Sequence, residues 1–327
     1  MVVFDKYGMY ETLENLYSQV EKGYELGVDI TVHSKIENIV VVGVGASAMP
    51  GYILQQYLHD SDVPVFVIED YSLPGFVTNN SLVFVISYTG NSDETLHLYK
   101  EVHKLGCQII SIGAAGKLRE LAMYNKTKHI LIPSGMQGRL AYPFMFFPIL
   151  RILENSGVIN EQDKYVKKTS NFLRNNKFEE ITGDIAEKII SKTPVIYSST
   201  KYEVVARKWK LNFNETAEIP SFYNTFPGAF HNDIAGFAKK NLDFYFILIK
   251  SNDETPVLLK KEKIFKELLK ELNLPIVEVG ITGDCYLAKI FSAMLMGDWM
   301  SYTLAIKKGV EPSSRRIVDE FEKRMNL

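Results

Sequence analysis

The chain has little cysteine, little net charge and no long apolar segment. Only two of its 327 residues are cysteines, Cys107 and Cys285, and they lie far apart in the sequence. This usage excludes a disulfide-stabilised scaffold and is typical of a reducing compartment. Thirty-seven basic and 39 acidic residues leave a formal net charge of −2, so no long-range attraction to nucleic acid or an anionic membrane is expected. An anionic ligand would therefore need a local binding site.

No apolar run is long enough to span a bilayer. The longest apolar patch covers residues 141–153 and is interrupted by Pro143, Pro148 and Arg151. The first residues do not have the pattern of a secretory signal peptide. These observations predict a cytoplasmic protein without membrane or nucleic-acid partners.

Short apolar runs recur along the chain and predict the strands of two parallel sheets. The expected strands are residues 39–42, 63–68, 81–86, 108–112 and 129–132 in the first half, and 193–197, 218–220, 244–249 and 275–279 in the second. Helical patterns are expected at residues 5–26, 140–155, 202–210, 257–271, 285–308 and 315–325 and between the strands of the first half. Strand–helix alternation of this kind predicts an α/β protein with two doubly wound parallel sheets, each covered by helices on both faces.

The domain boundary is predicted near residue 157, where a polar and charged region begins. This divides the chain into residues 1–157 and 158–327. The two halves repeat the same strand and helix pattern, which indicates an internal duplication.

A hydroxyl-rich turn follows the expected strand at residues 81–86. It contains Ser87, Thr89, Ser92 and Thr95 and leads directly into a helix. A helix N-terminus presents unpaired backbone N–H groups and the positive end of the helix dipole. Together with the hydroxyl donors, this predicts a binding site for a phosphate monoester. The second half has no copy of this turn.

Two alternatives remain open for these loops. Ser92 could be a simple N-cap, with Thr95 in the first turn of the helix. Residues 43–48 also match the G-x-G-x-x-A fingerprint of dinucleotide-binding proteins, and Glu69 and Asp70 end the next strand where an acid would hold a ribose. An NAD-dependent oxidoreductase that uses Gly43-x-Gly45 is therefore the competing enzyme class.

Several segments resemble the sugar isomerase (SIS) domain and, over nearly the whole chain, the bifunctional phosphoglucose/phosphomannose isomerases. The segments that carry the resemblance are Gly43-x-Gly45-x-Ser47, Asp70-Tyr71-x-Leu73-Pro74, the turn at residues 87–95, Gln137-Gly138-Arg139-Leu140-Ala141, residues 210–217, Phe230-His231-Asn232-Asp233 and residues 306–312. They occur in the order of the family. Gly138, Thr216 and Asp233 depart from its usual residues, which leaves the sugar preference open.

The resemblance implies interconversion of glucose 6-phosphate and mannose 6-phosphate with fructose 6-phosphate through a cis-enediolate, without a metal or a redox cofactor. It assigns the phosphate to a set of small residues in two turns, namely Gly45, Ser47, Ser87, Thr89 and Ser92. Glu215 would be the base that moves the proton, and Arg139 would face the enediolate oxygen. His231 would open the sugar ring, reaching the site from the partner subunit of a homodimer, and Lys323 would assist it.

The residues themselves allow other roles. Glu215 could be a surface acid of a helix, and Lys323 could belong to a solvated helix face, with Lys307 and Lys308 as weaker candidates for its role. A non-catalytic SIS protein that senses sugar phosphates is the alternative from a different functional class.

Overall fold

The computed structural model describes residues 4–237 and 243–325, and the chain divides into two compact units. The first unit comprises residues 14–175 and 283–289, and the second comprises residues 1–13, 176–282 and 290–327. The boundary therefore lies later than residue 157. The reason is that α7 (Asp163–Asn175) packs against α2 (Tyr17–Glu25) and completes the first unit.

The first unit contains a five-stranded parallel sheet in the order β2-β1-β3-β4-β5. Its strands are β1 (Asn38–Val42), β2 (Val65–Ile68), β3 (Ser81–Ile86), β4 (Gln108–Gly113) and β5 (Lys128–Leu131). The apolar runs of the sequence become strands because β-branched residues pack well on a sheet that is buried on both faces. This confirms the predicted fold class for the first half.

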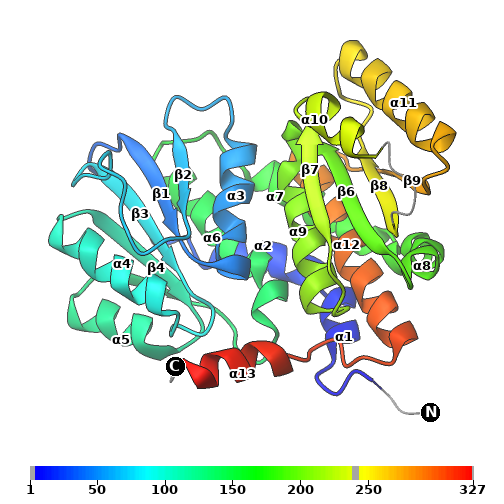
Figure 1. Cartoon of the computed structure of the whole chain (residues 1–327). Coiled ribbons are helices and arrows are strands. Elements are labelled where there is room, and N and C mark those ends of the chain that lie inside the picture. Colours follow the sequence, from blue (N-terminus) through cyan, green and yellow to red (C-terminus); the bar gives the residue numbers. More distant parts are fainter. Residues whose placement is uncertain (1–3, 238–242, 326–327) are drawn as a thin grey trace. The chain divides into compact units, whose positions relative to one another are not determined.

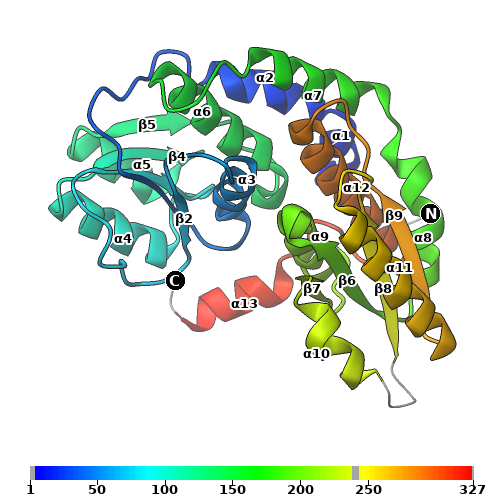
Figure 2. The ribbon, with the colours of Figure 1, turned by 90° about the horizontal axis from the view of Figure 1, so that it is seen from above.

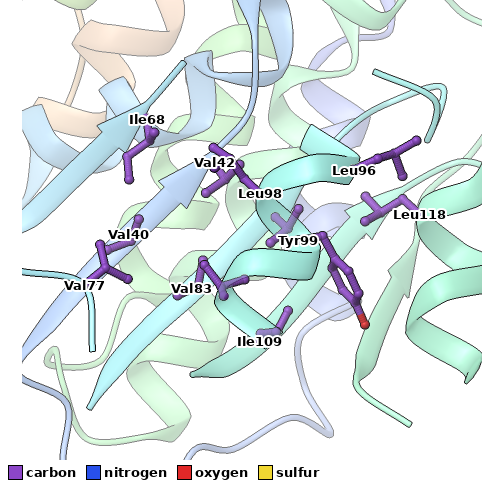
Figure 3. Close-up of a cluster of buried hydrophobic side chains, with 12 residues drawn as sticks. Val40, Val42, Ile68, Val77, Val83, Leu96, Leu98, Tyr99, Ile109 and Leu118 are labelled. Atoms are coloured by element: carbon purple, nitrogen blue, oxygen red, sulfur yellow. The ribbon is translucent and has the colours of Figure 1, made fainter. Parts of the chain in front are cut away.

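Helices cover both faces of this sheet. On one face lie α2, α3 (Met49–Tyr57) and α6 (Tyr142–Asn155), and on the other lie α4 (Asp93–Lys104) and α5 (Gly116–Tyr124) (Figure 1). Figure 3 shows the core under α4, where Val40, Val42 and Val83 of the sheet face Leu98 and Tyr99. The core holds the strand ends, and with them the loops that follow the strands, in fixed positions.

The second unit repeats this topology with a four-stranded parallel sheet in the order β7-β6-β8-β9. Its strands are β6 (Thr193–Ser199), β7 (Phe222–Phe226), β8 (Phe244–Lys250) and β9 (Ile276–Gly280). The edge strand predicted at residues 218–220 is wrong, because β7 begins only at Phe222 and Glu218 has a left-handed backbone with φ of 50°.

In the second unit, α9 (Glu203–Glu215) and α12 (Tyr286–Lys308) pack on one side of the sheet, whereas α10 (Ala229–Gly236) and α11 (Pro256–Glu271) pack on the other. Figure 2 shows α10 and α11 beside β7, β8 and β9. The unit also contains α8 (Phe178–Ile189) and α13 (Arg316–Arg324).

The helix predicted over residues 5–26 is divided into α1 (Met9–Glu14) and α2. The division has a local cause, because the N–H groups of Ser18 and Gln19 bond to carbonyl groups only three residues back, at Asn15 and Leu16. Such bonds form a tighter turn than that of an α-helix. Within the described ranges 4–237 and 243–325, no helix has the length and apolar character needed to cross a membrane.

A fully buried ionic network joins α9 to α12. The Lys208 ammonium donates to Asp298 Oδ1 at 2.5 Å and to Asn212 Oδ1 at 2.6 Å, and the Asn212 amide donates to the same Asp298 oxygen at 2.8 Å. A buried ion pair is a costly way to gain stability, but removing either partner would leave an uncompensated charge. The network therefore favours one arrangement of α9 against α12.

A second buried acid, Glu262, belongs to α11. The Glu262 side chain is only 1% exposed, and its Oε2 has no hydrogen-bond partner among the described residues. Burial raises the pKa of Glu262 from 4.5 to about 7, with further repulsion from Glu254 and Glu278 and a partly compensating attraction from Lys250. Near neutral pH the folded protein therefore retains a proton that the unfolded chain releases.

We expect the free energy of unfolding to fall as pH rises from about 4.5 to about 7, because only the folded state still binds the Glu262 proton in this interval. Glu262→Gln should remove this loss and raise the free energy of unfolding at pH 8 by about 1–3 kcal/mol. Urea unfolding at several pH values measures the effect. Glu267→Gln, at an exposed position of the same helix, is the control, and parallel pH curves for wild type and Glu262→Gln would contradict the prediction.

Candidate functional site

Three loops of the first unit meet at the carboxyl end of its sheet. The 3₁₀ turn η1 (Gly45–Ser47) follows β1, the hydroxyl-rich turn follows β3, and η2 (Gly138–Leu140) comes after β5. η1 and η2 contact one another. Open parallel sheets bind ligands at this end, next to the central strands.

The serines of this region turn toward one another. Ser87 Oγ lies 3.1 Å from Ser92 Oγ and accepts the Gly90 N–H at 3.1 Å, while Ser47 Oγ accepts the Tyr88 N–H at 3.3 Å. Ser92 occupies the N-cap position of α4, but its side chain makes no capping hydrogen bond. The hydroxyl is therefore directed to the turn and not to its own helix, which favours the anion-binding interpretation over simple capping. Thr89 is exposed on the same turn.

Two glycines give the turn its shape. Gly90 has φ of 73°, and a Cβ atom there would lie 1.9 Å from the carbonyl oxygen of Ala115. Gly116 has φ of 82°, and a Cβ atom there would lie 2.3 Å from the carbonyl oxygen of Thr89. The turn after β3 and the start of α5 thus approach each other more closely than any side chain would allow.

Glu69 shares this end of the sheet. Its carboxylate accepts the Gly45 N–H at 2.9 Å and the Tyr52 hydroxyl at 2.5 Å. Glu69 is one of the two acids, with Asp70, that the dinucleotide alternative places at a ribose, whereas here it bonds to the second glycine of the fingerprint itself. The Gly45 N–H is consequently engaged within the protein.

Tyr88 connects the turn to the loop that carries Arg139. Its hydroxyl accepts the Met136 N–H at 3.2 Å. Its side chain packs closely on Gly138, since a Cβ atom added to Gly138 would lie 3.2 Å from Cβ and Cδ1 of Tyr88. Arg139 is buried, with 4% of its surface exposed. The structure therefore gathers Gly45, Ser47, the serine turn and Arg139 at one end of the first sheet.

In the second unit, Glu215 is the last residue of α9 and is half-buried. It follows Asn212, a member of the buried ionic network, by one helical turn. The side chain of Asn214 is also fixed, because its Oδ1 accepts a hydrogen bond from the Ser221 hydroxyl at 2.8 Å. Two residues in the last turn of α9 before the predicted base, Asn212 and Asn214, are thus fixed by side-chain contacts.

His231 is exposed on α10, the helix that follows β7. The inward side of α10 is anchored by Asp233, which accepts the Tyr197 hydroxyl at 2.6 Å and the Asn224 amide at 3.0 Å. Burial and this hydrogen bond raise the pKa of the Tyr197 hydroxyl, so it remains a donor. Phe230 stacks on Phe226 at 4.1 Å. These contacts direct His231 away from its own sheet.

Glu215 and His231 lie at opposite ends of the second sheet. Because β6 and β7 are parallel, α9 runs back from the carboxyl end of β6 and ends at the amino end of β7, whereas α10 begins at the carboxyl end of β7 (Figure 1). β7 has five residues, which separates the two ends by roughly 15 Å. One subunit does not bring these two residues together.

The C-terminal lysines differ in their surroundings. Lys323 is exposed on α13, a helix without buried residues. Lys308, at the end of α12, instead donates to the carbonyl oxygens of Ala217 and Glu218, the second and third residues after Glu215. The sequence does not predict this contact.

Sequence reasoning missed the network of Lys208 and Asp298 as well. A signal was present, since Asp298 is a lone acid within an apolar helical stretch and Lys208 precedes the buried Trp209. A charge in such a place requires a partner, but the sequence does not identify it.

A hollow of about 680 Å³ lies elsewhere, at the amino end of the first sheet. Its lining includes Ile36, Tyr57, Asp60 and Asn160, and none of the predicted site residues belongs to it. In the part of the chain that the structure describes, no group of three or more His, Cys, Asp or Glu side chains is arranged to hold a metal ion.

The fold and the serine turn define a protein with two SIS domains. Residues 34–138 match the SIS domain model, and residues 178–325 match the model of the bacterial phospho-glucose isomerase C-terminal SIS domain. The glucosamine-6-phosphate deaminase structure of Thermotoga maritima has the same fold, with a TM-score of 0.69 and 15% identity over 93% of this chain and 96% of that one.

Full-length relatives identify the family. The bifunctional phosphoglucose/phosphomannose isomerase of Caldicellulosiruptor bescii is 32% identical over 95% of this chain and 97% of its own length. That of Thermoplasma acidophilum is 32% identical, with coverage of 88% and 90%. The D-glucosamine-6-phosphate 4-epimerase of Sulfolobus acidocaldarius is 27% identical, with coverage of 95% and 97%. The chain belongs to the bifunctional phosphoglucose/phosphomannose isomerase family and is an enzyme of the isomerase class.

We expect Gly90→Ala to lower the free energy of unfolding by about 2–4 kcal/mol, because a Cβ atom meets the Ala115 carbonyl oxygen and φ is positive. Gly75→Ala is the control, since nothing lies within 4 Å of its Cβ position. Urea unfolding measures both variants. Equal, small losses would show that the turn after β3 adapts to a side chain.

Proposed function

We propose that the enzyme interconverts glucose 6-phosphate and mannose 6-phosphate with fructose 6-phosphate through a cis-enediolate, in the cytoplasm. The observation that carries this proposal is the turn after β3, in which Ser92 directs its hydroxyl to Ser87 and leaves its own helix uncapped. The names of the full-length relatives supply the class of substrate.

The phosphate would be held by the N-terminus of α4 and the hydroxyls of Ser47, Ser87, Thr89 and Ser92, with the Gly45 turn beside them. Hydroxyl and backbone donors suit a phosphate dianion, and the positive end of the helix dipole adds to the attraction. Binding at the phosphate end fixes the reacting end of the sugar, so that remote binding energy is used to orient it.

Glu215 would carry the chemical step. Its carboxylate would take the proton from C2 of the open-chain aldose, which leaves an enediolate across C1 and C2. Return of the proton to C1, with a proton moved from the C2 hydroxyl to the C1 oxygen, gives the ketose. Arg139 would stabilise the negative enediolate oxygen. Both C2 epimers give the same enediolate, so return of the proton to either face of C2 yields glucose or mannose phosphate.

Ring opening would require a second group, because the substrates are mainly cyclic. His231 would transfer a proton to the ring oxygen, since imidazole both donates and accepts near neutral pH. Lys323 would assist it. The opposite positions of Glu215 and His231 on the second sheet support a homodimer in which His231 is supplied by the partner subunit.

We expect Glu215→Gln to abolish exchange of the substrate C2 proton with solvent while leaving the affinity for inorganic phosphate within about twofold, because the amide is not a base. NMR in D₂O with glucose 6-phosphate measures exchange at C2, and NMR with fructose 6-phosphate, in EDTA and without NAD, measures turnover to the two aldoses. Glu218→Gln, an exposed neighbour, is the matched control. Normal exchange in Glu215→Gln would exclude Glu215 as the base.

The same assay separates the alternatives. A sugar-phosphate sensor would bind fructose 6-phosphate without converting it, and a dehydrogenase would act only when NAD is added. Formation of glucose 6-phosphate without mannose 6-phosphate would restrict the enzyme to one substrate.

Mixing inactive subunits tests the shared site. A dimer of one Glu215→Gln and one His231→Ala subunit has one site with both native residues, if His231 comes from the partner. After full subunit exchange, about one quarter of wild-type activity on glucose 6-phosphate should return, because half of the dimers are mixed and each has one intact site. No recovery, in mixtures whose differently tagged subunits co-purify, would place both residues in the same subunit or outside the site.

A further inference from the structure

Lys308 contacts the backbone that follows Glu215. Its ammonium donates to the carbonyl oxygen of Ala217 at 2.9 Å and lies 3.5 Å from that of Glu218. These carbonyl groups come two and three residues after Glu215, where α9 has ended. They belong to the turn beyond the C-cap Thr216 and not to the helix itself, and a lysine near a helix C-terminus is a suitable donor for such carbonyl groups.

The segment held by Lys308 is otherwise shaped by its own backbone. Glu218 has φ of 50°, which is uncommon outside glycine, and the Ile219 N–H bonds to the Phe213 carbonyl at 3.1 Å to close the end of α9. Thr216 and Ala217 are buried. Lys308 is the side chain from α12 that completes this closure.

The Lys308 ammonium is partly desolvated. Burial lowers its pKa, and the charge of Glu218 opposes the change. A lysine gives up hydration only where other contacts replace it, and here the replacement is the pair of carbonyl groups. Its positive charge also lies beyond the C-terminal end of α9, where the helix dipole is negative.

Lys323 and Lys307, the other two lysines considered for assisting ring opening, do not lie against the end of α9. Lys307 pairs with Glu187 at 3.4 Å, and Lys323 is exposed on α13. Within residues 4–237 and 243–325, Lys308 is the one of these three that bonds to the segment after Glu215.

We propose that Lys308 is a positioning residue for Glu215, which fixes the end of α9 and compensates the negative charge there so that the carboxylate keeps one direction. The inference rests on the proposed role of Glu215 as the base. Lys308 does not touch the substrate in this account. Its loss should therefore lower the rate of the chemical step and leave the binding of the phosphate end unchanged, since a small displacement of a base is costly for proton transfer.

The experiment compares Lys308→Met and Lys308→Arg with Lys270→Met, an exposed lysine in the last turn of α11. We expect Lys308→Met to lower both kcat and exchange of the C2 proton of glucose 6-phosphate about tenfold or more, with KM for glucose 6-phosphate within about twofold. Lys308→Arg, which keeps the charge and the donors, should restore kcat to within about threefold of wild type. Lys270→Met should equal wild type.

Three outcomes would overturn the proposal: wild-type kcat in Lys308→Met, a change confined to KM, or a loss in Lys308→Arg as large as in Lys308→Met. If Lys308→Met does not fold, Lys308→Gln replaces it, because glutamine retains an N–H donor without the positive charge. An unchanged kcat in Lys308→Gln would show that the charge is dispensable and would overturn the proposal. Failure of the proposed function is distinguished by Glu215→Gln: if that variant exchanges normally, Glu215 is not the base and the Lys308 proposal falls with it.

Discussion

The directionality of a parallel sheet is the constraint on which the rest of this structure depends. Each strand–helix–strand crossover returns the chain to the amino end, so a helix end and a strand end lie on opposite sides of a domain. Glu215 ends the helix between β6 and β7, and His231 follows β7. A sugar ring is far smaller than the distance between them. The proposed roles of Glu215 and His231 in one reaction therefore go together with the proposed homodimer.

In the proposed function, the candidate anion site would let a nearly neutral protein bind a phosphate dianion without a cluster of lysines. The turn after β3 uses hydroxyls, backbone N–H groups and a helix dipole, and Arg139 is buried nearby. Glu69 adds a negative charge at the edge of this site by accepting the Gly45 N–H. The donors are thus distributed among several loops, which explains why close glycine contacts are needed to bring those loops together.

The sequence predicted the strands better than the other elements, because a strand buried on both faces is a short apolar run such as that at residues 81–86. The edge strand was misplaced to residues 218–220, where the apolar pattern is short and the backbone of Glu218 turns instead. Helices α7 and α8 were not predicted, since their exposed faces are polar and charged. The hydroxyl-rich turn was predicted correctly in position, but whether Ser92 caps its helix depends on a side-chain direction that no pattern specifies.

The amino-acid sequence by itself determined the fold class, the repeated alternation of strands and helices and the residue types available for chemistry, because these follow from apolar periodicity and from local turn composition. The tertiary structure decided which polar groups meet. It joined Lys208 to Asp298 and brought Lys308 to the carbonyl group of Ala217, pairs that are separated by about ninety residues in the chain. The physical reason is that a buried or half-buried charge must find a partner, while only the packing of distant elements determines which partner is within reach.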